Sequence, residues 1–315
     1  DVAAAPDGHG SAQVGVGPDA RVGSHEDVAF DIGAGLDDPA LFDVEPPGDA
    51  HAVLDRSPAA HGQAVEQEVH PRSQQGLVRG ARRLHALNNM EAEQFLDSGG
   101  KPEQIFISPN GIDVEEYREL PDGANFRARY GIPADAPGVL FLARVHKIKG
   151  VDFLVSSFAE ASRALPTALL VIAGPDDGYL PEVKRQVQTL GIEDRVRFTG
   201  YIDGQAKLET YRAANVYVLP STYEILGITL LESLACGTPV ITTDRCGLVD
   251  ALRQKELGSV VAYGDVKGLK EEIIRALSSP TKGAEYRRNF VLQNYGWDKI
   301  AEGWEEVYRQ CAGEK

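Results

Sequence analysis

Several features of secreted and membrane proteins are scarce in this chain. Only three of its 315 residues are cysteines, Cys236, Cys246 and Cys311, and their wide spacing argues against a disulfide framework or a structural zinc site. The longest uncharged stretches, 164–175 and 233–243, are shorter than the roughly 18 apolar residues of a membrane-spanning helix. No basic segment followed by an apolar one opens the sequence, so we predict no secretory signal. We therefore expect a cytoplasmic chain.

Positive charge is also scarce. The formal net charge is −15, and most of the negative excess lies in residues 1–100, which hold six arginines, no lysine and seventeen acidic residues. An acidic chain is a poor partner for nucleic acid or anionic lipid unless it has a local basic site. We therefore expect no nucleic-acid partner.

Residues 1–84 contain no Lys, Tyr, Trp, Cys or Asn and a single Ile, and neither a helical nor a strand period persists in them. We expect an atypical segment that is either disordered or mis-translated, because a GC-rich gene that is read in the wrong frame gives this composition. Six of the seven histidines lie between His9 and His85. They are scattered without the spacing of metal ligands, so a metal-binding tail is the less favoured alternative.

The pattern changes at residue 85. Residues 85–96 have a helical period, and 105–108 predict a strand that ends in the turn Pro-Asn-Gly-Ile-Asp at 109–113. From residue 139 onward, short apolar strands alternate with amphipathic helices, which predicts an α/β fold with a doubly wound parallel sheet. The expected strands are 139–143, 168–173, 195–199, 216–219, 240–242 and 259–262, and the expected helices are 151–165, 180–190, 205–214, 228–235, 267–277, 284–292 and 297–310.

The loops after the expected strands are candidates for a site, because doubly wound sheets bind ligands at the carboxyl ends of their strands. The loop after 139–143 holds Arg144, Lys147 and Lys149, which are cations suited to phosphate, although a solvated surface loop is the alternative. The loop after 168–173 begins with Gly174. This glycine would let a ligand approach the backbone closely or would merely form a tight turn.

The most informative stretch is 219–239. A loop that carries Glu224 and Gly227 leads into a helix near Ile228, and free backbone N–H groups at a helix start form an anion site. Glu232 lies one turn further on the same face, where it would accept hydrogen bonds from a ribose diol, unless it faces water or pairs with Arg144. An unpaired glutamate is costly to bury in an apolar helix, which favours the ligand-binding role.

A series of short motifs runs in a fixed order along the chain. They are Pro-Asn-Gly-Ile-Asp at 109–113, Arg144 with Lys149-Gly150, Ala173-Gly174-Pro175, Phe198-Thr199-Gly200, Pro220-Ser221, Glu224 with Glu232, Ala-Cys-Gly-Thr-Pro-Val at 235–240, and Tyr295-Gly296-Trp297. Together they resemble the C-terminal donor-binding domain of family 4 retaining glycosyltransferases of the GT-B fold, over residues 85–310. The resemblance implies a remnant helix of an N-terminal domain with a linker over 85–136, a Rossmann-like nucleotide-sugar-binding domain over 137–296 and a terminal helix over 297–315.

The resemblance implies a retaining enzyme that moves a sugar from a nucleoside diphosphate sugar to a glycan, lipid or small-molecule acceptor, without a metal ion or other cofactor. Arg144 and Lys149 would stabilise the leaving diphosphate electrostatically. The backbone of Gly227, Ile228 and Thr229 would complete that anion site.

The remaining implied contacts concern the sugar and the nucleoside. Glu224 would contact the donor sugar, and Glu232 would bind the ribose hydroxyls. Gly174 would let the donor approach the backbone. The turn that contains Tyr201 and Ile202 would face the base.

Members of this family also have an N-terminal domain that binds the acceptor, and residues 1–84 do not resemble it. We therefore expect the acceptor half to be absent or aberrant, and the alternative function is a nucleotide-sugar-binding module without transfer activity. An epimerase or a phosphorylase of the same fold is less favoured, because no lysine is placed to hold pyridoxal phosphate.

A lipid acceptor would place the protein at the cytoplasmic face of a membrane, although no basic amphipathic helix indicates this. Cys236 and Cys246 are expected to be packed thiols rather than nucleophiles.

Overall fold

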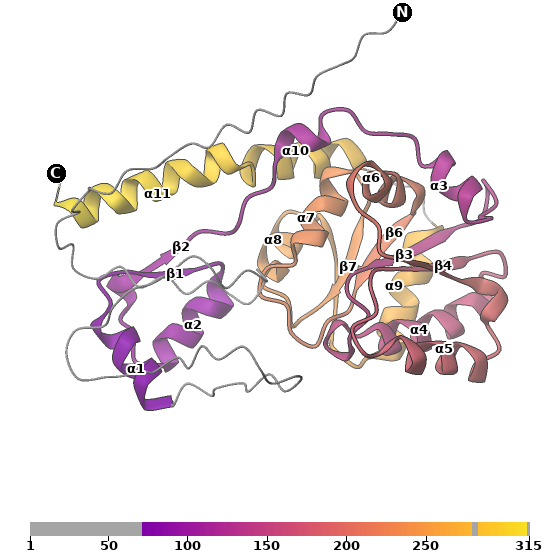
Figure 1. The fold of residues 1–315 in the computed structure, drawn as a ribbon, viewed down its shortest axis with the longest axis horizontal. Coiled ribbons are helices and arrows are strands. Elements are labelled where there is room, and N and C mark those ends of the chain that lie inside the picture. The colour runs from indigo at the N-terminus through magenta and orange to yellow at the C-terminus, as the bar shows by residue number, and fades with distance from the viewer. Residues whose placement is uncertain (1–70, 279–282, 314–315) are drawn as a thin grey trace, which may run out of the picture.

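The computed structural model describes residues 71–278 and 283–313, which form a large α/β domain beside a smaller unit (Figure 1). From residue 139 onward, every expected strand and helix is present with ends within two residues of the expected ones. The six strands of the large domain are β3 (Gly138–Leu142), β4 (Leu169–Ala173), β5 (Val196–Gly200), β6 (Val216–Leu219), β7 (Val240–Thr243) and β8 (Gly258–Val261).

The large sheet is parallel throughout, with the strand order β5-β4-β3-β6-β7-β8. All residues of β3 and β4 are buried, because helices cover both faces of the sheet. The chain reverses its direction across the sheet between β3 and β6, which pair at Val139 and Val216. This pair is the topological switch point, so the fold predicts a ligand at the carboxyl ends of β3 and β6.

Helices lie on both faces of the sheet. In Figure 1 the helices α4, α5 and α9 lie on one side of the strands, and α6 and α7 lie on the other. Helix α4 buries Val151, Leu154, Val155 and Phe158 completely, which confirms the expected helical period. The α-helices of the large domain are α3 (Ala124–Arg129), α4 (Val151–Ala164), α5 (Leu180–Thr189), α6 (Gly204–Ala213), α7 (Ile228–Ala235), α8 (Val249–Gln254), α9 (Val266–Ser278) and α10 (Ala284–Asn294).

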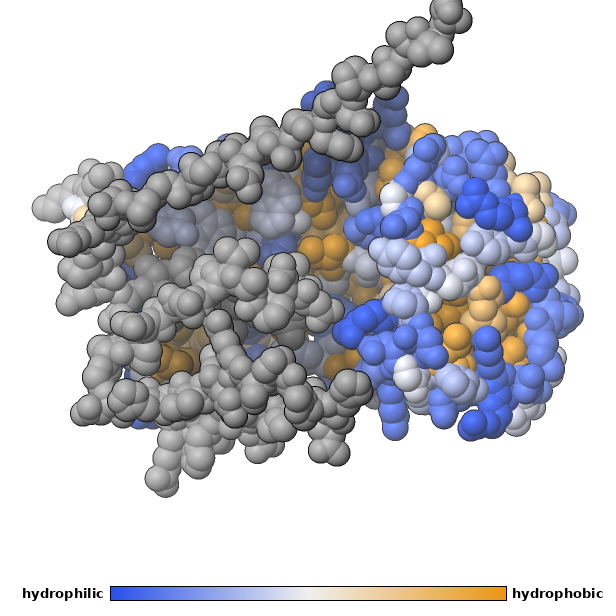
Figure 2. Space-filling view, viewed as in Figure 1, coloured by the Kyte–Doolittle hydropathy of each residue, from blue (hydrophilic) through white to orange (hydrophobic). Residues whose placement is uncertain are grey.

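The face of the large domain that Figure 2 shows is mainly polar. Hydrophilic residues predominate on the face in Figure 2, and hydrophobic residues gather there only in small patches. The large buried side chains of the domain lie inside, among them Phe141, Phe158, Tyr211 and Tyr217. None of the described helices combines the length and the apolar character needed to cross a membrane.

The smaller unit corrects the expected helix over 85–96. The strand β1 (Leu84–Ala86) pairs in parallel with β2 (Ile105–Ile107), and the helix α2 (Asn89–Asp97) begins only at Asn89. Leu84 and Ala86 are buried on one side of the strand. Asn88 is extended and caps α2, so the chain leaves the strand conformation there rather than continuing a helix from residue 85.

The described structure begins at residue 71, before the expected boundary at residue 84. The helix α1 (Pro71–Gly80) and the start of β1 belong to the described structure. Gln104 of the small unit holds the end of α1 and the residue after it, because its side-chain amide donates to the carbonyl oxygens of Arg79 and Ala81. The predictions for residues 1–70, including five of the six N-terminal histidines, lie outside the described residues.

The C-terminal helix connects the two parts of the chain. The turn at 109–113 meets the start of α11 (Trp297–Ala312), where the backbone N–H of Ile112 donates to the carbonyl oxygen of Tyr295 (2.7 Å). From there α11 runs back along the small unit (Figure 1). The Trp304 ring lies 4.5 Å from the His85 ring and 5.2 Å from the Phe106 ring, so α11 packs against β1 and β2.

Candidate functional site

Two loops meet at the switch point of the sheet. The loop after β3 ends in a 3-10 turn, Lys147–Lys149, followed by Gly150, whose φ is +67°. A Cβ atom on Gly150 would lie 2.0 Å from the carbonyl oxygen of Pro220, directly after β6, so only glycine allows this approach. The backbone N–H of Thr222 donates to the carbonyl oxygen of Ile148 (2.8 Å). The loops after β3 and β6 are therefore joined.

An ion pair spans these two loops. Lys149 Nζ lies 2.7 Å from Glu224 Oε2, and the two side chains are 20% and 15% exposed. The hydroxyl of Ser221, which the sequence analysis named only as part of the Pro220-Ser221 motif, donates to the same carboxylate oxygen (3.4 Å). The structure thus brings together the residue expected to hold the diphosphate and the residue expected to contact the donor sugar.

The start of α7 lies beside this pair. Gly227 has a φ of +75°, and a Cβ atom there would lie 3.3 Å from Cγ of Glu224. No side chain caps the helix start, and the first backbone N–H groups of a helix have no partner within the helix. The positive end of the helix dipole and these N–H groups suit an anion next to Lys149.

A buried hydroxyl fixes this helix start on the sheet. The Tyr217 hydroxyl lies 2.8 Å from the Thr229 hydroxyl and 3.0 Å from the carbonyl oxygen of Leu142 at the end of β3. Burial raises the pKa of Tyr217 well above its ordinary value, so the phenol stays protonated. The side chain of Thr229 is therefore directed to the protein, and only its backbone faces the expected anion site.

Glu232 lies one turn further along α7 and is 9% exposed. Its Oε1 accepts a hydrogen bond from Lys207 Nζ (2.7 Å), and its Oε2 accepts one from the Tyr211 hydroxyl (2.8 Å). The alternative that Glu232 pairs with Arg144 is wrong. Glu232 pairs with Lys207 instead, because α6, which carries Lys207, lies beside α7 on the same face of the sheet.

The sequence analysis missed Lys207 and Tyr211. Both lie on α6 at positions i and i+4, which share one face of a helix, and this spacing was the available signal. Burial and the nearby Glu232 charge raise the pKa of Tyr211 well above its ordinary value, and they act on Tyr117 in the same direction. Both phenols stay protonated, and the Tyr211 hydroxyl serves Glu232 as a donor. Each oxygen of a carboxylate has a second lone pair, so Glu232 can still accept hydrogen bonds from a diol.

Arg144 occupies the outer side of the site. Its side chain is 62% exposed, and Nη1 lies 2.7 Å from Asp177 Oδ2 in the loop after β4. Gly174 lies between these loops with a φ of +137°, and a Cβ atom there would lie 1.9 Å from the carbonyl oxygen of Ala143. Exposed ion pairs contribute little free energy, so an anionic ligand can compete with Asp177 for Arg144.

The turn after β5 lies at the same edge of the sheet. The backbone N–H of Gly174 donates to the carbonyl oxygen of Gly200 (2.8 Å), the residue before this turn. Tyr201 is 70% exposed, whereas Ile202 packs partly against the core. That Tyr201 and Ile202 face a base stays a prediction.

Cys236 and Cys246 are both buried, which confirms that they are packed thiols. Burial raises the pKa of each thiol to about 12. They are therefore protonated near neutral pH and do not act as nucleophiles, since the thiolate is the reactive form.

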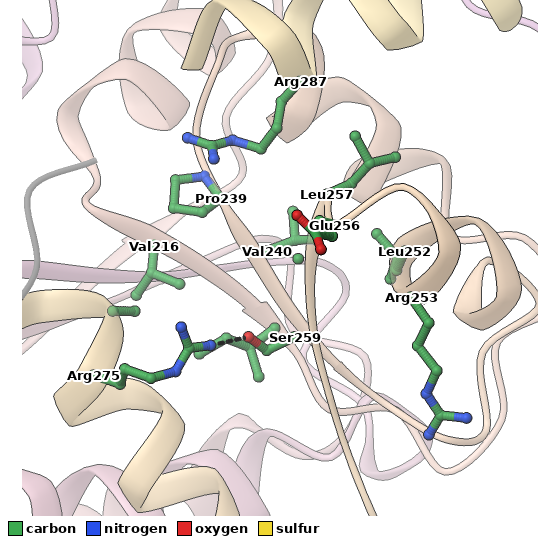
Figure 3. Close-up of a pocket in the computed structure, with 13 residues that line it drawn as sticks. Val216, Pro239, Val240, Leu252, Arg253, Glu256, Leu257, Ser259, Arg275 and Arg287 are labelled. Atoms are coloured by element: carbon green, nitrogen blue, oxygen red, sulfur yellow. Dashed lines mark hydrogen bonds between the residues drawn. The ribbon is translucent and has the colours of Figure 1, made fainter. Parts of the chain in front are cut away.

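In the described part of the chain, no cluster of three or more His, Cys, Asp or Glu side chains has a geometry that could hold a metal ion. A cavity of about 440 Å³ does lie in the large domain, at the amino-terminal ends of β6, β7 and β8 (Figure 3). Arg253, Glu256, Arg275 and Arg287 are among its lining residues. None of the expected site residues lines it, and it faces the edge of the sheet opposite to the switch-point loops. The expected site residues therefore lie at the carboxyl edge of the sheet, away from this cavity.

Comparison with known proteins identifies a family for this chain. Residues 122–297 match the family described as "Glycosyl transferases group 1". A protein named D-inositol 3-phosphate glycosyltransferase from Kineococcus radiotolerans is 30% identical over 277 residues, which are 81% of this chain and 63% of that protein. The protein of the same name from Acidothermus cellulolyticus is 34% identical over 250 residues, 76% of this chain and 55% of that protein. The chain thus spans less than two thirds of the length of these relatives.

Solved structures show the same fold. Sucrose-phosphate synthase from Thermosynechococcus elongatus matches with a TM-score of 0.66 and 28% identity, over 78% of this chain and 62% of that one. The crystal structure of Anabaena HepE in complex with UDP and glucose matches with a TM-score of 0.69 and 21% identity, over 76% and 66% of the two chains.

Proposed function

Because this chain belongs to the group 1 glycosyl transferase family, we propose that it moves a sugar from a nucleoside diphosphate sugar to an acceptor hydroxyl. We further propose that the reaction retains the anomeric configuration and needs no metal ion or other cofactor. The observation that supports this most is the meeting of Lys149, Glu224 and the start of α7 at the switch point of the sheet.

The diphosphate would lie between Lys149 and the start of α7. When the bond between the sugar and the phosphate breaks, negative charge develops on the leaving phosphate. The ammonium group of Lys149, the backbone N–H groups of Ile228 and Thr229 and the guanidinium of Arg144 would stabilise that charge. Lys149 is paired with Glu224 before the donor binds, so it would exchange part of this contact for phosphate oxygens.

The sugar and the ribose would contact the two glutamates. Glu224 is anionic beside the diphosphate position, so it would bind sugar hydroxyls and stabilise the positive charge of an oxocarbenium-like transition state. The acceptor hydroxyl would attack the anomeric carbon from the side of the leaving group. Its proton would pass to an oxygen of the leaving phosphate, which removes the need for a separate base. Glu232 would hold the ribose hydroxyls.

The relatives suggest the first substrates to test. Several structures of the same fold contain UDP, two of Anabaena HepE among them, and several relatives are named for D-inositol 3-phosphate. We propose a uridine diphosphate sugar as donor and a phosphorylated polyol as the first acceptor to try. The cytoplasmic location and the peripheral membrane association stay predictions.

A second candidate function is donor binding without transfer. Every donor-binding group described above lies between residues 144 and 232, within one domain. A transferase cleft also needs an acceptor-binding surface, and the donor groups would bind a nucleotide sugar in its absence.

Nuclear magnetic resonance of the product tests retention. With an α-linked uridine diphosphate sugar and D-inositol 3-phosphate, we expect an α-linked product that forms equally well after treatment with EDTA. A β-linked product would contradict retention, and loss of transfer in EDTA with recovery on adding Mg²⁺ would contradict metal independence. Donor binding without any transfer would support the second candidate.

A further inference from the structure

The small unit reaches the candidate site through a side chain at the start of α2. Asn88 is polar, yet it is only 8% exposed. Its Oδ1 accepts a hydrogen bond from the backbone N–H of Glu91 (3.0 Å) and caps the helix, while its Nδ2 donates to the carbonyl oxygen of Ile225 in the loop after β6. The cap thus determines that the amide oxygen faces the helix and the NH₂ group faces the loop.

The carbonyl that Asn88 binds belongs to the residue directly after Glu224. Backbone hydrogen bonds also tie the loop after β6 to the segment after β7. The N–H of Glu224 donates to the carbonyl oxygen of Arg245 (3.0 Å), and the N–H of Gly247 donates to the carbonyl oxygen of Glu224 (2.9 Å). A Cβ atom on Gly247 would lie 1.8 Å from the Ile225 oxygen and 2.0 Å from Asn88 Nδ2. The three segments meet so closely that only glycine fits at position 247.

Two other polar contacts link the same helix to the large domain, and both are exposed. Asn89 Nδ2 donates to Asp250 Oδ2 (3.0 Å), and Gln94 Nε2 donates to the Tyr223 hydroxyl (3.1 Å). Water replaces an exposed hydrogen bond more readily than the partly buried contact of Asn88. Among the contacts of α2 with the large domain, the Asn88 bond is therefore the one suited to hold the loop.

We infer that Asn88 is a positioning residue for the donor sugar. It holds the peptide between Glu224 and Gly227, so that the Glu224 carboxylate and the N–H groups at the start of α7 keep one orientation toward the donor. The inference rests on the proposed function. It makes the donor site depend on a residue of the small unit, outside the domain that supplies the donor-binding groups.

The substitution Asn88→Asp separates this role from helix capping. Aspartate caps a helix as well as asparagine does, so α2 keeps its start. It cannot donate to the Ile225 carbonyl, and it places a negative charge beside that oxygen. Asn89→Ala is the matched control, because it removes the exposed contact one residue further along. Asn88→Ser, which also caps a helix but is too short to reach the loop, replaces the aspartate variant if that one does not melt cooperatively.

Hydrogen exchange of the full chain is the primary measurement. In Asn88→Asp we expect faster exchange over residues 222–229, while exchange in α2 stays as in the native protein. UDP-glucose, used as the probe, should bind about tenfold more weakly, the factor that corresponds to about 1.4 kcal/mol, with a smaller change for UDP. Asn89→Ala should leave the exchange and both affinities unchanged.

Unchanged exchange over 222–229 in Asn88→Asp would overturn the inference, whatever the ligand affinities. An equal loss of affinity for UDP and for UDP-glucose would overturn the specific role of Asn88 toward the sugar. If the native chain bound neither ligand, the proposed function would fail, and the exchange would still decide whether Asn88 holds the loop.

Discussion

Lys149 and Glu232 each have a partner of opposite charge in this structure. Lys149 pairs with Glu224, and Glu232 pairs with Lys207. These pairs hold the four side chains in defined positions before a donor arrives. A diphosphate would compete for Lys149, whereas a ribose would add to the acceptor capacity of Glu232 that remains.

Replacing Lys149 with alanine should therefore weaken the binding of a nucleoside diphosphate more than the binding of a nucleoside. We expect the affinity for UDP to fall by about tenfold or more, because a charge-assisted hydrogen bond contributes about 1.5–3 kcal/mol, and the affinity for uridine to change little. Isothermal titration calorimetry with both ligands measures this. Lys147→Ala is the control, since Lys147 is exposed on the same turn. Equal losses for UDP and uridine would contradict the role of Lys149.

The buried thiols give a prediction that does not depend on the ligand. At pH 8 a thiol reagent should label Cys311 rapidly in the native chain and should label Cys236 and Cys246 only after denaturation. Because burial raises both thiol pKa values from 9.0 to about 12, the unfolded chain loses these protons first as the pH rises. The free energy of unfolding should therefore fall between pH 9 and 12. Rapid native labelling of all three thiols would refute this account.

At the scale of elements, the site depends on loops that approach each other at glycine. Gly150 lets the loop after β3 contact Pro220 after β6, and Gly174 lets the loop after β4 contact Ala143. The glycine positions were visible in the sequence as parts of motifs. The contacts were not, because they join segments that are distant along the chain.

Gly150→Ala should show the cost of losing this approach. An alanine at this position would have a positive φ, and its Cβ atom would collide with the Pro220 oxygen. We therefore expect a loss of stability of about 2–3 kcal/mol and weaker UDP binding. Gly178→Ala is the control, because Gly178 has a φ of +80° but no atom within 4 Å of the added Cβ. Urea denaturation compares the two. A similar loss of stability in both would show that the contact with Pro220 does not matter.

Regular elements were predictable where one period dominated. Helix α4 was predicted from the spacing of Val151, Leu154, Val155 and Phe158, and strands such as β3 and β4 from their continuous apolar runs. The change from β1 to α2 was missed, because the helical period of 85–96 hid a strand of three residues and a cap at Asn88. The pairing of Glu232 with Lys207 was missed because it depends on how α6 packs beside α7.

At the scale of the whole molecule, several polar contacts and an aromatic cluster connect the small unit to the rest. Asn88 binds the loop after β6, and Trp304 of α11 packs on His85 and Phe106. A two-stranded sheet is too small to be stable alone, so these contacts contribute to the order of residues 71–108. The doubly wound sheet followed from the alternating pattern, but the return of α11 to the small unit did not.

The central claim is that the carboxyl edge of the large sheet binds a nucleoside diphosphate. The most direct test is a calorimetric titration of UDP into the native chain, Glu232→Gln and Glu256→Gln, the last of which alters the cavity at the opposite edge. We predict that the native chain and Glu256→Gln bind UDP equally, and that Glu232→Gln binds it about tenfold more weakly. Equal binding by the native chain and Glu232→Gln, or weaker binding only in Glu256→Gln, would contradict the assignment of the site.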